Sequence, residues 1–385
     1  MLKSTYDVIV IGSGPSGCAA AYNLAEKGIR TLILEKATLP RKKLCAGGIT
    51  RRGMKLIPKS LNHVIERKYL DVDLFIHDIK KKYTSQSQSP IISIVSRDRF
   101  DHAFALEASK KGAVIADKIN VKQLDTTKSK IEVITEKGTY KGDYIILADG
   151  ANSNLAKNLE WQDKRKLVPA MEIEINPDSN FHLYERLRFD FSFTSGGYAW
   201  VFPKKNKISI GMLGSNGSSL RVELKKYINF LGLETYNSPI PIKGHPIPMR
   251  ARKKPFYRSR VLLVGDSAGF VDPLTGEGIS FALKSGILAA NSITNGFAYP
   301  NLVNNYYENY LSNEIIRELR VGEIFSYLMY GPEWLRSRLF NIYGPSLCLL
   351  MEKVISGDKT YYELATNFNN YLKLISLYNF NLSPR

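Results

Sequence analysis

The sequence predicts an α/β protein in three parts: a Rossmann-like dinucleotide-binding domain, an inserted and largely antiparallel β-sheet domain, and a C-terminal helical region. Three observations support this fold class. The first 35 residues read as strand, glycine-rich turn, helix and strand. A second Gly-Asp turn occurs far along the chain, at 265–266. Between the two turns, residues 166–250 carry aromatic strands with a period of two.

The chain of 385 residues is long enough for two or three domains. The dinucleotide-binding domain is expected to be discontinuous, because its second glycine turn returns after the inserted strands. The expected division is 1–65, 97–165 and 251–296 for the dinucleotide-binding domain, 66–96 and 166–250 for a substrate-binding β-sheet domain, and 297–385 for the helical region.

The N-terminal unit follows from local composition. Residues 6–11 are apolar and β-branched, which predicts a buried strand, and the Ala-rich residues 19–27 predict a helix. Gly28 is placed to end that helix, and residues 31–35 form a second strand.

The later elements are predicted in the same way. Residues 97–111 read as a helix, and residues 113–141 as short alternating strands. A buried strand over 144–148 ends at Asp149 and Gly150. The sheet domain and its return then give strands at 168–175, 187–193, 198–203 and 207–213, a helix at 218–232, a strand at 260–264, a helix after Gly278, and helices from 297 to the end broken at Gly344-Pro345 and Gly357.

Composition limits the class of protein. No stretch of 18 apolar residues predicts a spanning helix, and the N-terminus lacks a signal-peptide pattern. Cys18, Cys45 and Cys348 are too few for a disulfide framework or for an iron–sulfur cluster. We therefore expect a cytoplasmic protein without a metal ion, in which Cys18 only packs inside a helix.

The formal charge of +18 is compatible with nucleic acid, with an anionic membrane face, or with a soluble basic surface that has no partner. No nucleic-acid-binding motif supports the first interpretation, so we expect no such partner. The membrane interpretation gains weight if the substrate is a lipid, and then predicts peripheral contact on the inner membrane face.

The first glycine turn indicates a dinucleotide. Gly12 permits the tight turn, Gly14 lets the backbone approach a pyrophosphate, and Gly17 allows close helix–strand packing. Ser16 lies at the helix N-terminus, where free amides and a positive dipole end favour phosphate. Glu35, at the end of the second strand, is placed to accept hydrogen bonds from ribose hydroxyls.

The second turn favours FAD over a nicotinamide cofactor. Asp266 is placed to bond the sugar-derived chain of the flavin, and Gly278 and Ile279 open a helix whose dipole favours anionic reduced flavin. Glu277 is expected to point away from the flavin ring. Arg97 is expected to pair with the pyrophosphate, and Val121 is included among the cofactor-binding residues.

These motifs resemble those of the flavoprotein superfamily that contains para-hydroxybenzoate hydroxylase. The matching residues are the turn at 12–17, Arg97 with Phe100 and Asp101, Asp149-Gly150, and Gly265-Asp266 through Gly278.

Within that superfamily, the run 198–203 (Tyr-Ala-Trp-Val-Phe-Pro), followed by Gly211, resembles the signature of geranylgeranyl reductases. Residues 355–361 are also similar to a family feature. Residues 43–48 are similar to the cysteine-containing flavin loop of that family, which places Cys45, Ala46 and Gly48 at the cofactor. The loop reads Cys-Ala-Gly-Gly where many archaeal members have Cys-Gly-Glu-Gly.

Period-2 spacing puts Tyr198, Trp200 and Phe202 on one strand face, where they would form an aromatic floor for a prenyl chain. Three such aromatics are also compatible with plain core. We expect these residues to bind the substrate, and we assign Tyr198, Trp200 and Cys45 as the candidate catalytic residues. His245, between Gly244 and Pro246, is expected to be a structural turn residue.

The resemblance implies reduction of isolated double bonds in the geranylgeranyl chains of isoprenoid membrane lipids, by hydride from reduced flavin and a separate proton. A dry apolar pocket would protect developing positive charge from water. The electron donor stays open between ferredoxin and NAD(P)H. The substrate stays open among a phospholipid, a free diphosphate, a menaquinone tail and a chlorophyll precursor.

Three other functions share parts of the pattern. A flavin monooxygenase acting on an aromatic or isoprenoid substrate has the same scaffold, and a flavin halogenase has a related aromatic-Pro strand. A prenyl-protein carrier binds isoprenoid lipid without flavin, and the intact glycine set argues against that function.

Overall fold

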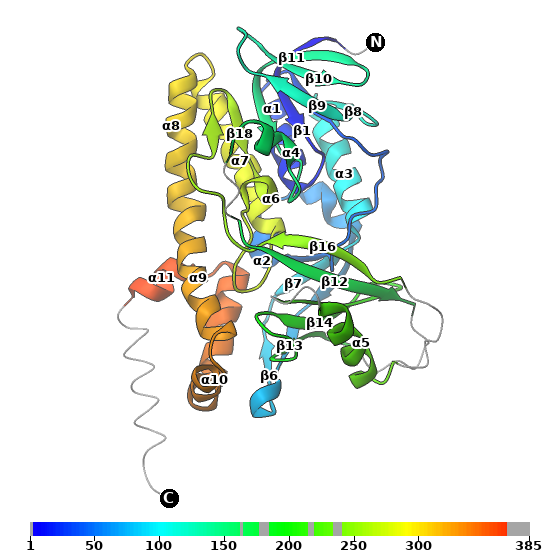
Figure 1. Cartoon of the computed structure of the whole chain (residues 1–385), viewed down its shortest axis with the longest axis vertical. Helices are drawn as coiled ribbons and strands as arrows, with labels where there is room; N and C mark the ends of the chain where they lie inside the picture. Colours follow the sequence, from blue (N-terminus) through cyan, green and yellow to red (C-terminus); the bar gives the residue numbers. More distant parts are fainter. Residues whose placement is uncertain (1–2, 162–164, 177–184, 215–218, 234–240, 368–385) are drawn as a thin grey trace, which may run out of the picture.

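Two β-sheets organise the molecule in the computed structural model, one in each half of the view in Figure 1. The structure describes residues 3–161, 165–176, 185–214, 219–233 and 241–367. The predicted α/β class is confirmed, with a first sheet that is parallel at its centre, a largely antiparallel second sheet and a helical C-terminal region.

The first sheet has eight strands. Its central strands β11, β1, β2 and β8 run parallel, and β1 lies between β11 and β2 with almost all its side chains buried. The strands in spatial order are β17 (Tyr257–Arg258), β18 (Val261–Leu263), β11 (Gly138–Leu147), β1 (Thr5–Ile11), β2 (Thr31–Leu34) and β8 (Val114–Ala116). In addition, β10 (Ile131–Thr135) pairs with β11, and β9 (Val121–Asp125) pairs with β10.

Helices α1 (Pro15–Glu26), α3 (Arg97–Lys110) and α7 (Ile279–Gly296) pack together on this sheet. Gly286 permits the close α1–α7 approach, because a Cβ there would meet the Ser16 carbonyl oxygen at 2.2 Å. The short helices α4 (Asn154–Asn158) and α6 (Gly265–Ala268) lie at the carboxyl ends of β11 and β18. Ligands bind at that edge in folds of this type.

The second sheet has seven strands and lies below the first in Figure 1. All its pairs are antiparallel except β13 with β5. The strands in order are β16 (Lys243–Pro248), β12 (Leu167–Ile175), β15 (Ile208–Leu213), β14 (Tyr198–Pro203), β13 (Leu187–Phe191), β5 (Asp71–Ile76) and β6 (Lys81–Gln86). Helix α5 (Leu220–Phe230) covers one face through an apolar cluster.

A small three-stranded sheet connects the two halves. It pairs β7 (Ile92–Val95) with β3 (Gly48–Thr50) and β4 (Ile65–Tyr69). Helix α2 (Arg51–Met54) follows β3 directly, and short 3-10 turns occupy Lys59–Val64 and His77–Ile79. Strand β3 continues from the loop after β2, so this sheet holds that loop beside the second sheet.

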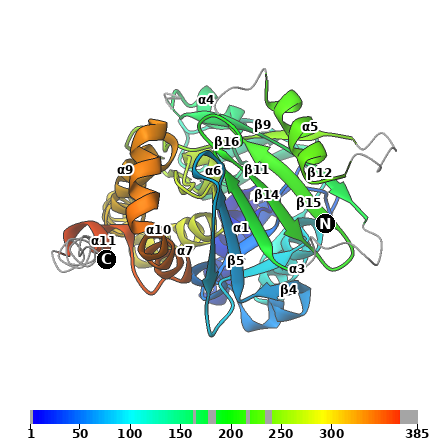
Figure 2. The ribbon, with the colours of Figure 1, turned by 90° about the horizontal axis from the view of Figure 1, so that it is seen from below.

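The C-terminal region is helical as predicted, with α8 (Pro300–Leu311), α9 (Arg317–Tyr330), α10 (Glu333–Ser356) and α11 (Tyr361–Thr366). A single π-helical turn, Ser312–Ile316, joins α8 to α9. Figure 2 shows α9, α10 and α11 together at one side of the second sheet, with α10 near β5. The predicted helical run beyond residue 367 lies outside the described residues.

The predicted break at Gly344-Pro345 is wrong, because α10 continues through both residues. Pro345 leaves the carbonyl of Asn341 without its helical donor, but both residues are exposed, so water can satisfy that carbonyl. Gly344 is a packing residue, since a Cβ there would lie 2.3 Å from the Tyr83 ring. The predicted break at Gly357 is confirmed, with φ of +74° at the end of the helix.

Candidate active site

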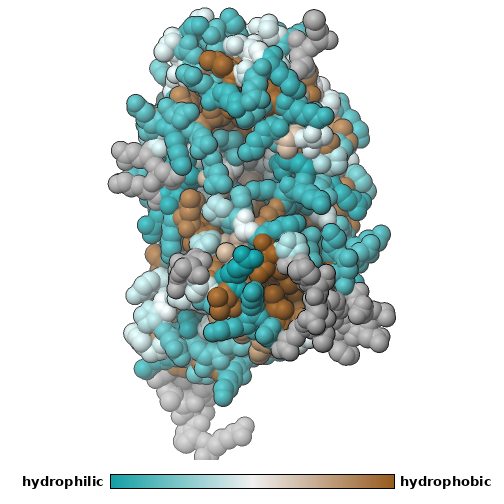
Figure 3. Space-filling view, turned by 45° about the vertical axis from the view of Figure 1, so that its right-hand side comes forward, coloured by the Kyte–Doolittle hydropathy of each residue, from teal (hydrophilic) through white to brown (hydrophobic). Residues whose placement is uncertain are grey.

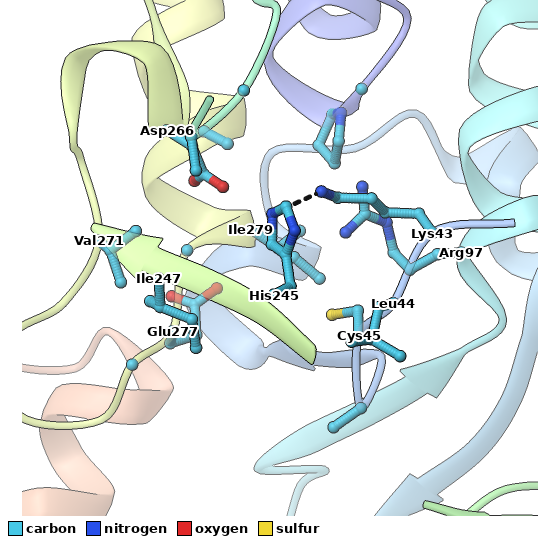
Figure 4. A pocket seen from close by; sticks show the side chains of 18 of the residues that line it. Lys43, Leu44, Cys45, Arg97, His245, Ile247, Asp266, Val271, Glu277 and Ile279 are labelled. Carbon is cyan, nitrogen blue, oxygen red and sulfur yellow. Dashed lines mark hydrogen bonds between the residues drawn. The ribbon is translucent and has the colours of Figure 1, made fainter. Parts of the chain in front are cut away.

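A large cavity of about 940 Å³ lies between the carboxyl edge of the first sheet and the face of the second sheet that carries Tyr198, Trp200 and Phe202. Figure 4 shows Asp266 and Ile279 on one side of this space, with His245 and Cys45 converging on it from other elements. The size is at the upper end of the range for cofactor and small-molecule pockets. The glycine turn, the loop after β2 and the aromatic strand β14 all contribute lining residues.

The glycine turn has the geometry expected for a dinucleotide. Gly12 has a φ of +105°, and a Cβ there would lie 2.4 Å from the Ala148 carbonyl oxygen. A Cβ on Gly17 would lie 2.0 Å from the Gly12 carbonyl oxygen, so this glycine serves packing and does not line the cavity. At Gly14 a Cβ would meet only an Arg41 nitrogen at 3.8 Å, which leaves the backbone open to a ligand.

Glu35 is buried at the end of β2 and already holds part of the site together. Its Oε2 accepts bonds from the Ser13 amide at 3.0 Å and the Ser13 hydroxyl at 2.7 Å. Arg41 Nε lies 3.1 Å from the same oxygen. Burial alone would raise the pKa of the Glu35 carboxyl, but Arg41 and these hydrogen bonds lower it below its usual value. The residue is therefore an anion, as a ribose-binding carboxylate needs to be.

Arg97 and Arg41 share one buried carboxylate. Asp101 is fully buried, and Arg97 binds it through two nitrogens at 2.8 and 2.9 Å. Arg41 Nη2 lies 3.3 Å from Asp101 Oδ2. Both arginines line the cavity, so Asp101 positions two cations where a pyrophosphate would need them. Arg97 was predicted from the sequence, whereas Arg41 and Asp101 were not assigned roles.

Asp149 lies in the cavity wall beside the glycine turn, and its Oδ1 is buried without a hydrogen-bond partner in the described part of the chain. Burial raises the pKa of Asp149 to about 6, although Ser153 and its own backbone amide act in the opposite direction. An orphaned carboxylate oxygen at this position is suited to accept a bond from a ligand hydroxyl or amide.

Asp149 gives a pH-dependent prediction. Its folded-state pKa of about 6 exceeds the unfolded value of 3.8, so its contribution to stability falls as pH rises between those values. We expect flavin-free Asp149→Asn to be more stable than wild type at pH 7 by about 3 kcal/mol, with the difference falling below about 1 kcal/mol near pH 4. Urea unfolding at both pH values measures this, and an equal difference at both would contradict it.

The loop from Arg41 to Gly48 leads from β2 of the first sheet to β3 of the small three-stranded sheet. Gly47 donates its amide to Cys45 Sγ at 3.4 Å, and Arg97 also hydrogen-bonds the Cys45 side chain. Lys204, which directly follows β14, donates from its ammonium group to the Cys45 carbonyl at 3.3 Å. These contacts hold Cys45, Ala46 and Gly48 at the cavity wall, and their contact with a cofactor stays a prediction.

His245 lies in β16 and not in a turn, so the prediction of a structural turn residue is wrong. Its Nε2 is 2.8 Å from Lys43 Nζ, the contact drawn as a dashed line in Figure 4. Burial and the neighbouring Lys43 lower the pKa of His245, and burial lowers the pKa of Lys43. The Gly-His-Pro sequence suggested a turn, whereas pairing with β12 makes it a strand facing the cavity.

Tyr198, Trp200 and Phe202 all line the cavity from one face of β14. Their neighbours on β13, Phe189 and Phe191, extend the floor, with ring centroids of Phe189 and Phe202 5.1 Å apart. Tyr198 donates its hydroxyl to the Thr275 carbonyl, and burial raises the pKa of this phenol further above its usual value. The hydroxyl is thus already bonded and is a weak proton donor.

The return from β18 forms the opposite wall. Asp266 lies in the first turn of α6 and faces the cavity. Gly278 directly precedes α7, and a Cβ on this glycine would lie 3.4 Å from Asp266 Oδ1. Glu277 Oε1 accepts a hydrogen bond from the Ser280 amide at 2.6 Å, and Glu277 Oε2 lies 3.3 Å from Arg52 Nη2. Its carboxylate is therefore occupied by protein partners.

The structure thus gathers the predicted site residues around one space, with the exception of Gly17. The predicted residues that line the cavity are Gly12, Gly14, Ser16, Glu35, Cys45, Ala46, Gly48, Arg97, Val121, Tyr198, Trp200, Phe202, Asp266, Gly278 and Ile279. Their individual roles stay predictions. Lining residues without a predicted role include Arg41, Lys43, Glu172, His245, Cys348 and Met351.

These residues fit FAD. Open backbone at Gly14, the anion Glu35, the cation pair Arg41 and Arg97, and the start of α7 all line the cavity. Together they match the diphosphate, ribose and flavin recognition that such a cofactor requires. The unpartnered oxygen of Asp149 belongs to the same lining.

No cluster of three or more potential metal ligands occurs among the described residues. Within the same residues, none of the helices has both the length and the apolarity needed to cross a bilayer. On the face shown in Figure 3, most residues are hydrophilic, and hydrophobic side chains gather in the lower half.

Comparison with known proteins agrees with this site. The family described as FAD binding domain matches residues 5–210. An uncharacterized protein of Methanosarcina barkeri is 30% identical over 351 residues, covering 88% of each chain. A digeranylgeranylglycerophospholipid reductase of Methanocaldococcus jannaschii is 30% identical over 310 residues, covering 75% of this chain and 76% of the other.

Among solved structures, a geranylgeranyl bacteriochlorophyll reductase-like protein of Thermoplasma acidophilum has the same fold. It superimposes with a TM-score of 0.79 at 23% identity, covering 94% of this chain and 99% of that one.

Proposed function

Because this chain belongs to the geranylgeranyl reductase family of FAD-binding oxidoreductases, we propose that it saturates isolated carbon–carbon double bonds of geranylgeranyl chains in isoprenoid lipids. The observation that carries the proposal is one cavity with two different walls. A charged, glycine-rich wall fits the cofactor, and an apolar floor of aromatic and aliphatic side chains faces it.

The apolar part of the cavity is long as well as aromatic. Beyond β14 and β13 it is lined by Val72 and Leu74 of β5, and by Cys348, Met351 and Ile355 of α10. A prenyl chain is apolar and methyl-branched, so burial of its surface here is favourable along its length. An aromatic hydroxylation substrate would not need a lining that extends to α10.

FAD, when bound and reduced, supplies the hydride for such a reduction. The chain's own residues bind the cofactor, orient the alkene and exclude water. Phe189, Tyr198 and Phe202 present apolar surface to the prenyl chain, and the 41–48 loop lines the same cavity. Exclusion of water protects positive charge that develops on the branched carbon.

The test is co-expression with a pathway that makes geranylgeranyl lipids, followed by mass measurement of the extracted lipids. We expect gains of hydrogen pairs relative to cells without the protein. A gain of oxygen would instead indicate a monooxygenase, and halogen incorporation a halogenase. A colourless protein that binds prenyl lipid unchanged would indicate a carrier. Comparison of phospholipid, diphosphate and quinone or chlorophyll-precursor pools identifies the substrate class.

The electron donor is proposed to be ferredoxin or NAD(P)H. Neither is expected to need a second full GxGxxG dinucleotide turn in this chain, because each can dock transiently at the flavin edge. Anaerobic mixing of the oxidised protein with each donor, followed by flavin bleaching, distinguishes them.

We further propose that the protein contacts an anionic membrane through α10. From Leu339 to Met351 this helix carries no charged residue, and Leu349 within this range is 51% exposed. Trp334, near the start of the same helix, is 69% exposed. The same helix lines the apolar cavity through Cys348 and Met351. A half-exposed apolar helix with a terminal tryptophan suits a membrane interface, and the net charge of +18 suits an anionic one.

The double variant Trp334→Glu, Leu349→Glu is expected to bind anionic vesicles at least about tenfold more weakly, with unchanged flavin content. The matched control is Phe230→Glu on α5, which is 53% exposed but remote from α10. Vesicle sedimentation measures both variants. Equal loss in the control would point to charge alone, and a concentration-dependent dimer through α10 would identify a protein partner instead of a membrane.

A further inference from the structure

The cavity floor contains one carboxyl group among apolar side chains. Pairing across β12, β15, β14 and β13 places side chains of three rows on the same face of the sheet. The rows are Ala170, Leu213, Tyr198 and Phe191; Glu172, Gly211, Trp200 and Phe189; and Glu174, Ser209, Phe202 and Leu187. Glu172 lies in the middle row, is only 4% exposed, and lines the cavity. Glu174, in the third row, is exposed and does not line it.

Neighbouring side chains hold Glu172 in position. Ser209 donates its hydroxyl to Glu172 Oε2 at 2.9 Å, and Trp200 donates its indole N–H to the Ser209 hydroxyl oxygen at 3.1 Å. Gly211 makes this chain of bonds possible, because a Cβ there would lie 2.3 Å from the Trp200 ring. The glycine and the tryptophan of the aromatic motif therefore serve to place the indole beside Glu172.

Glu172 also reaches the loop after β2 and lies one row from a solvated edge of the sheet. The Cys45 backbone amide hydrogen-bonds its carboxylate, so the acid lies where the loop meets the floor. Lys204 lies close to it and donates to Glu174 Oε1 at 2.7 Å. Glu174, one row further along the sheet, has a third of its side-chain surface exposed, so this edge of the sheet meets water.

The surroundings favour a protonated acid despite a nearby cation. Burial raises the pKa of Glu172, with the neighbouring carboxylate Glu174 acting in the same direction. Lys204, the Ser209 hydroxyl and the Cys45 amide act to lower it. Lys243 faces the same side of the sheet from β16, in register with Glu172, but its side chain is exposed.

We propose that Glu172 is the proton donor for double-bond reduction in this cavity, an inference that rests on the proposed function. The π bond of the alkene breaks, and its electron pair forms a C–H bond to the carboxyl proton of Glu172. The other carbon receives the hydride that reduced flavin supplies, so the flavin is oxidised and the alkene is reduced. The Glu172 carboxylate then regains a proton from water.

Other acids near the floor are less suited to this role. The Tyr198 hydroxyl is bonded to the Thr275 carbonyl and has a raised pKa. Glu277 is held by Arg52 and by the Ser280 amide. Glu172 alone of these three belongs to the sheet face that would carry the prenyl chain.

The decisive experiment compares Glu172→Gln with the matched control Glu174→Gln, which lies on the same strand and face and shares Lys204. Chemically reduced protein is mixed anaerobically with a geranylgeranyl substrate, and flavin reoxidation is followed. We expect reoxidation to be about 10²-fold slower or more in Glu172→Gln and near wild type in Glu174→Gln. Flavin affinity and spectrum should be unchanged in both.

An independent readout uses no substrate. Infrared difference spectra of the FAD-bound protein, taken as pH is changed, should show a carboxylic-acid C=O band that titrates above the usual glutamate range. That band should be absent in Glu172→Gln and present in Glu174→Gln. If Glu172→Gln does not fold, Glu172→Asp keeps the acid on a shorter arm and should retain the band but lower the rate.

The outcomes separate the two proposals. If the wild-type protein leaves every geranylgeranyl substrate unreduced, the proposed function fails. If the wild type reduces the substrate and Glu172→Gln does so equally fast, Glu172 is not the donor and water or another acid is. A wild-type rate that falls as pH rises through the infrared pKa, and a flat profile in the variant, would support the assignment.

Discussion

Replacement of Gly12 by alanine is expected to give a protein that purifies without FAD and unfolds more readily. The residue has a φ of +105°, and the new Cβ would lie 2.4 Å from the Ala148 carbonyl oxygen. That oxygen belongs to the backbone beside β11, so neither partner can move without displacing the strand. We expect a loss of about 3 kcal/mol in unfolding free energy.

Gly28→Ala is the matched control. Gly28 also has a left-handed φ, of +76°, but a Cβ there meets nothing within 4 Å. Its cost should be limited to backbone strain of about 1 kcal/mol, with full flavin content. The ratio of visible flavin absorbance to protein absorbance and urea unfolding measure both variants. Retention of FAD in Gly12→Ala would show that the turn tolerates displacement of β11.

Much of the fold could be predicted because its signals are local. The turn at Gly12, the end of α1 near Gly28 and the aromatic alternation along β14 depend on neighbours in sequence. The helix α5 and the return to the first sheet through β18 followed from the same patterns.

The errors arose where long-range contacts decide the structure. Gly344 and Pro345 read as a helix break, but Tyr83, more than 250 residues earlier, packs against Gly344 and helps to keep α10 continuous. His245 read as a turn residue, but pairing with Ala170 places it in a strand. Local sequence cannot distinguish these cases.

The most consequential residue that the sequence did not indicate is Glu172. It lies in an apolar strand, and an alternating Glu-Ile-Glu pattern is typical of a strand with one solvated face. Only the register with Gly211 and Trp200 shows that the first glutamate is buried in the floor while the second reaches water. Two chemically identical side chains thus differ in role because of their neighbours.

A second large effect is expected from Asp101→Asn. Asp101 is fully buried and is the shared partner of Arg97 and Arg41, at distances from 2.8 to 3.3 Å. Removing its charge leaves two cations facing one another beside the cavity. Loss of one member of a buried ion network costs about 3 kcal/mol or more, because the remaining charge is uncompensated.

The same substitution should weaken FAD binding, because Arg41 also contacts Glu35 and would no longer be held in position. We expect lower flavin occupancy in Asp101→Asn, and partial recovery of stability when excess FAD supplies its diphosphate charge. Thermal unfolding with and without added FAD measures both effects.

Asp7→Asn is the control for the loss of an aspartate–arginine pair as such. Asp7 binds Arg30 through two oxygens in the same sheet region, but the Arg30 side chain is 58% exposed. Water screens that pair, so its loss should change stability little and flavin binding not at all. If both variants lost stability equally, the effect of Asp101 could not be attributed to a buried network, and if Asp101→Asn kept full flavin occupancy, the two arginines would not depend on it for their position.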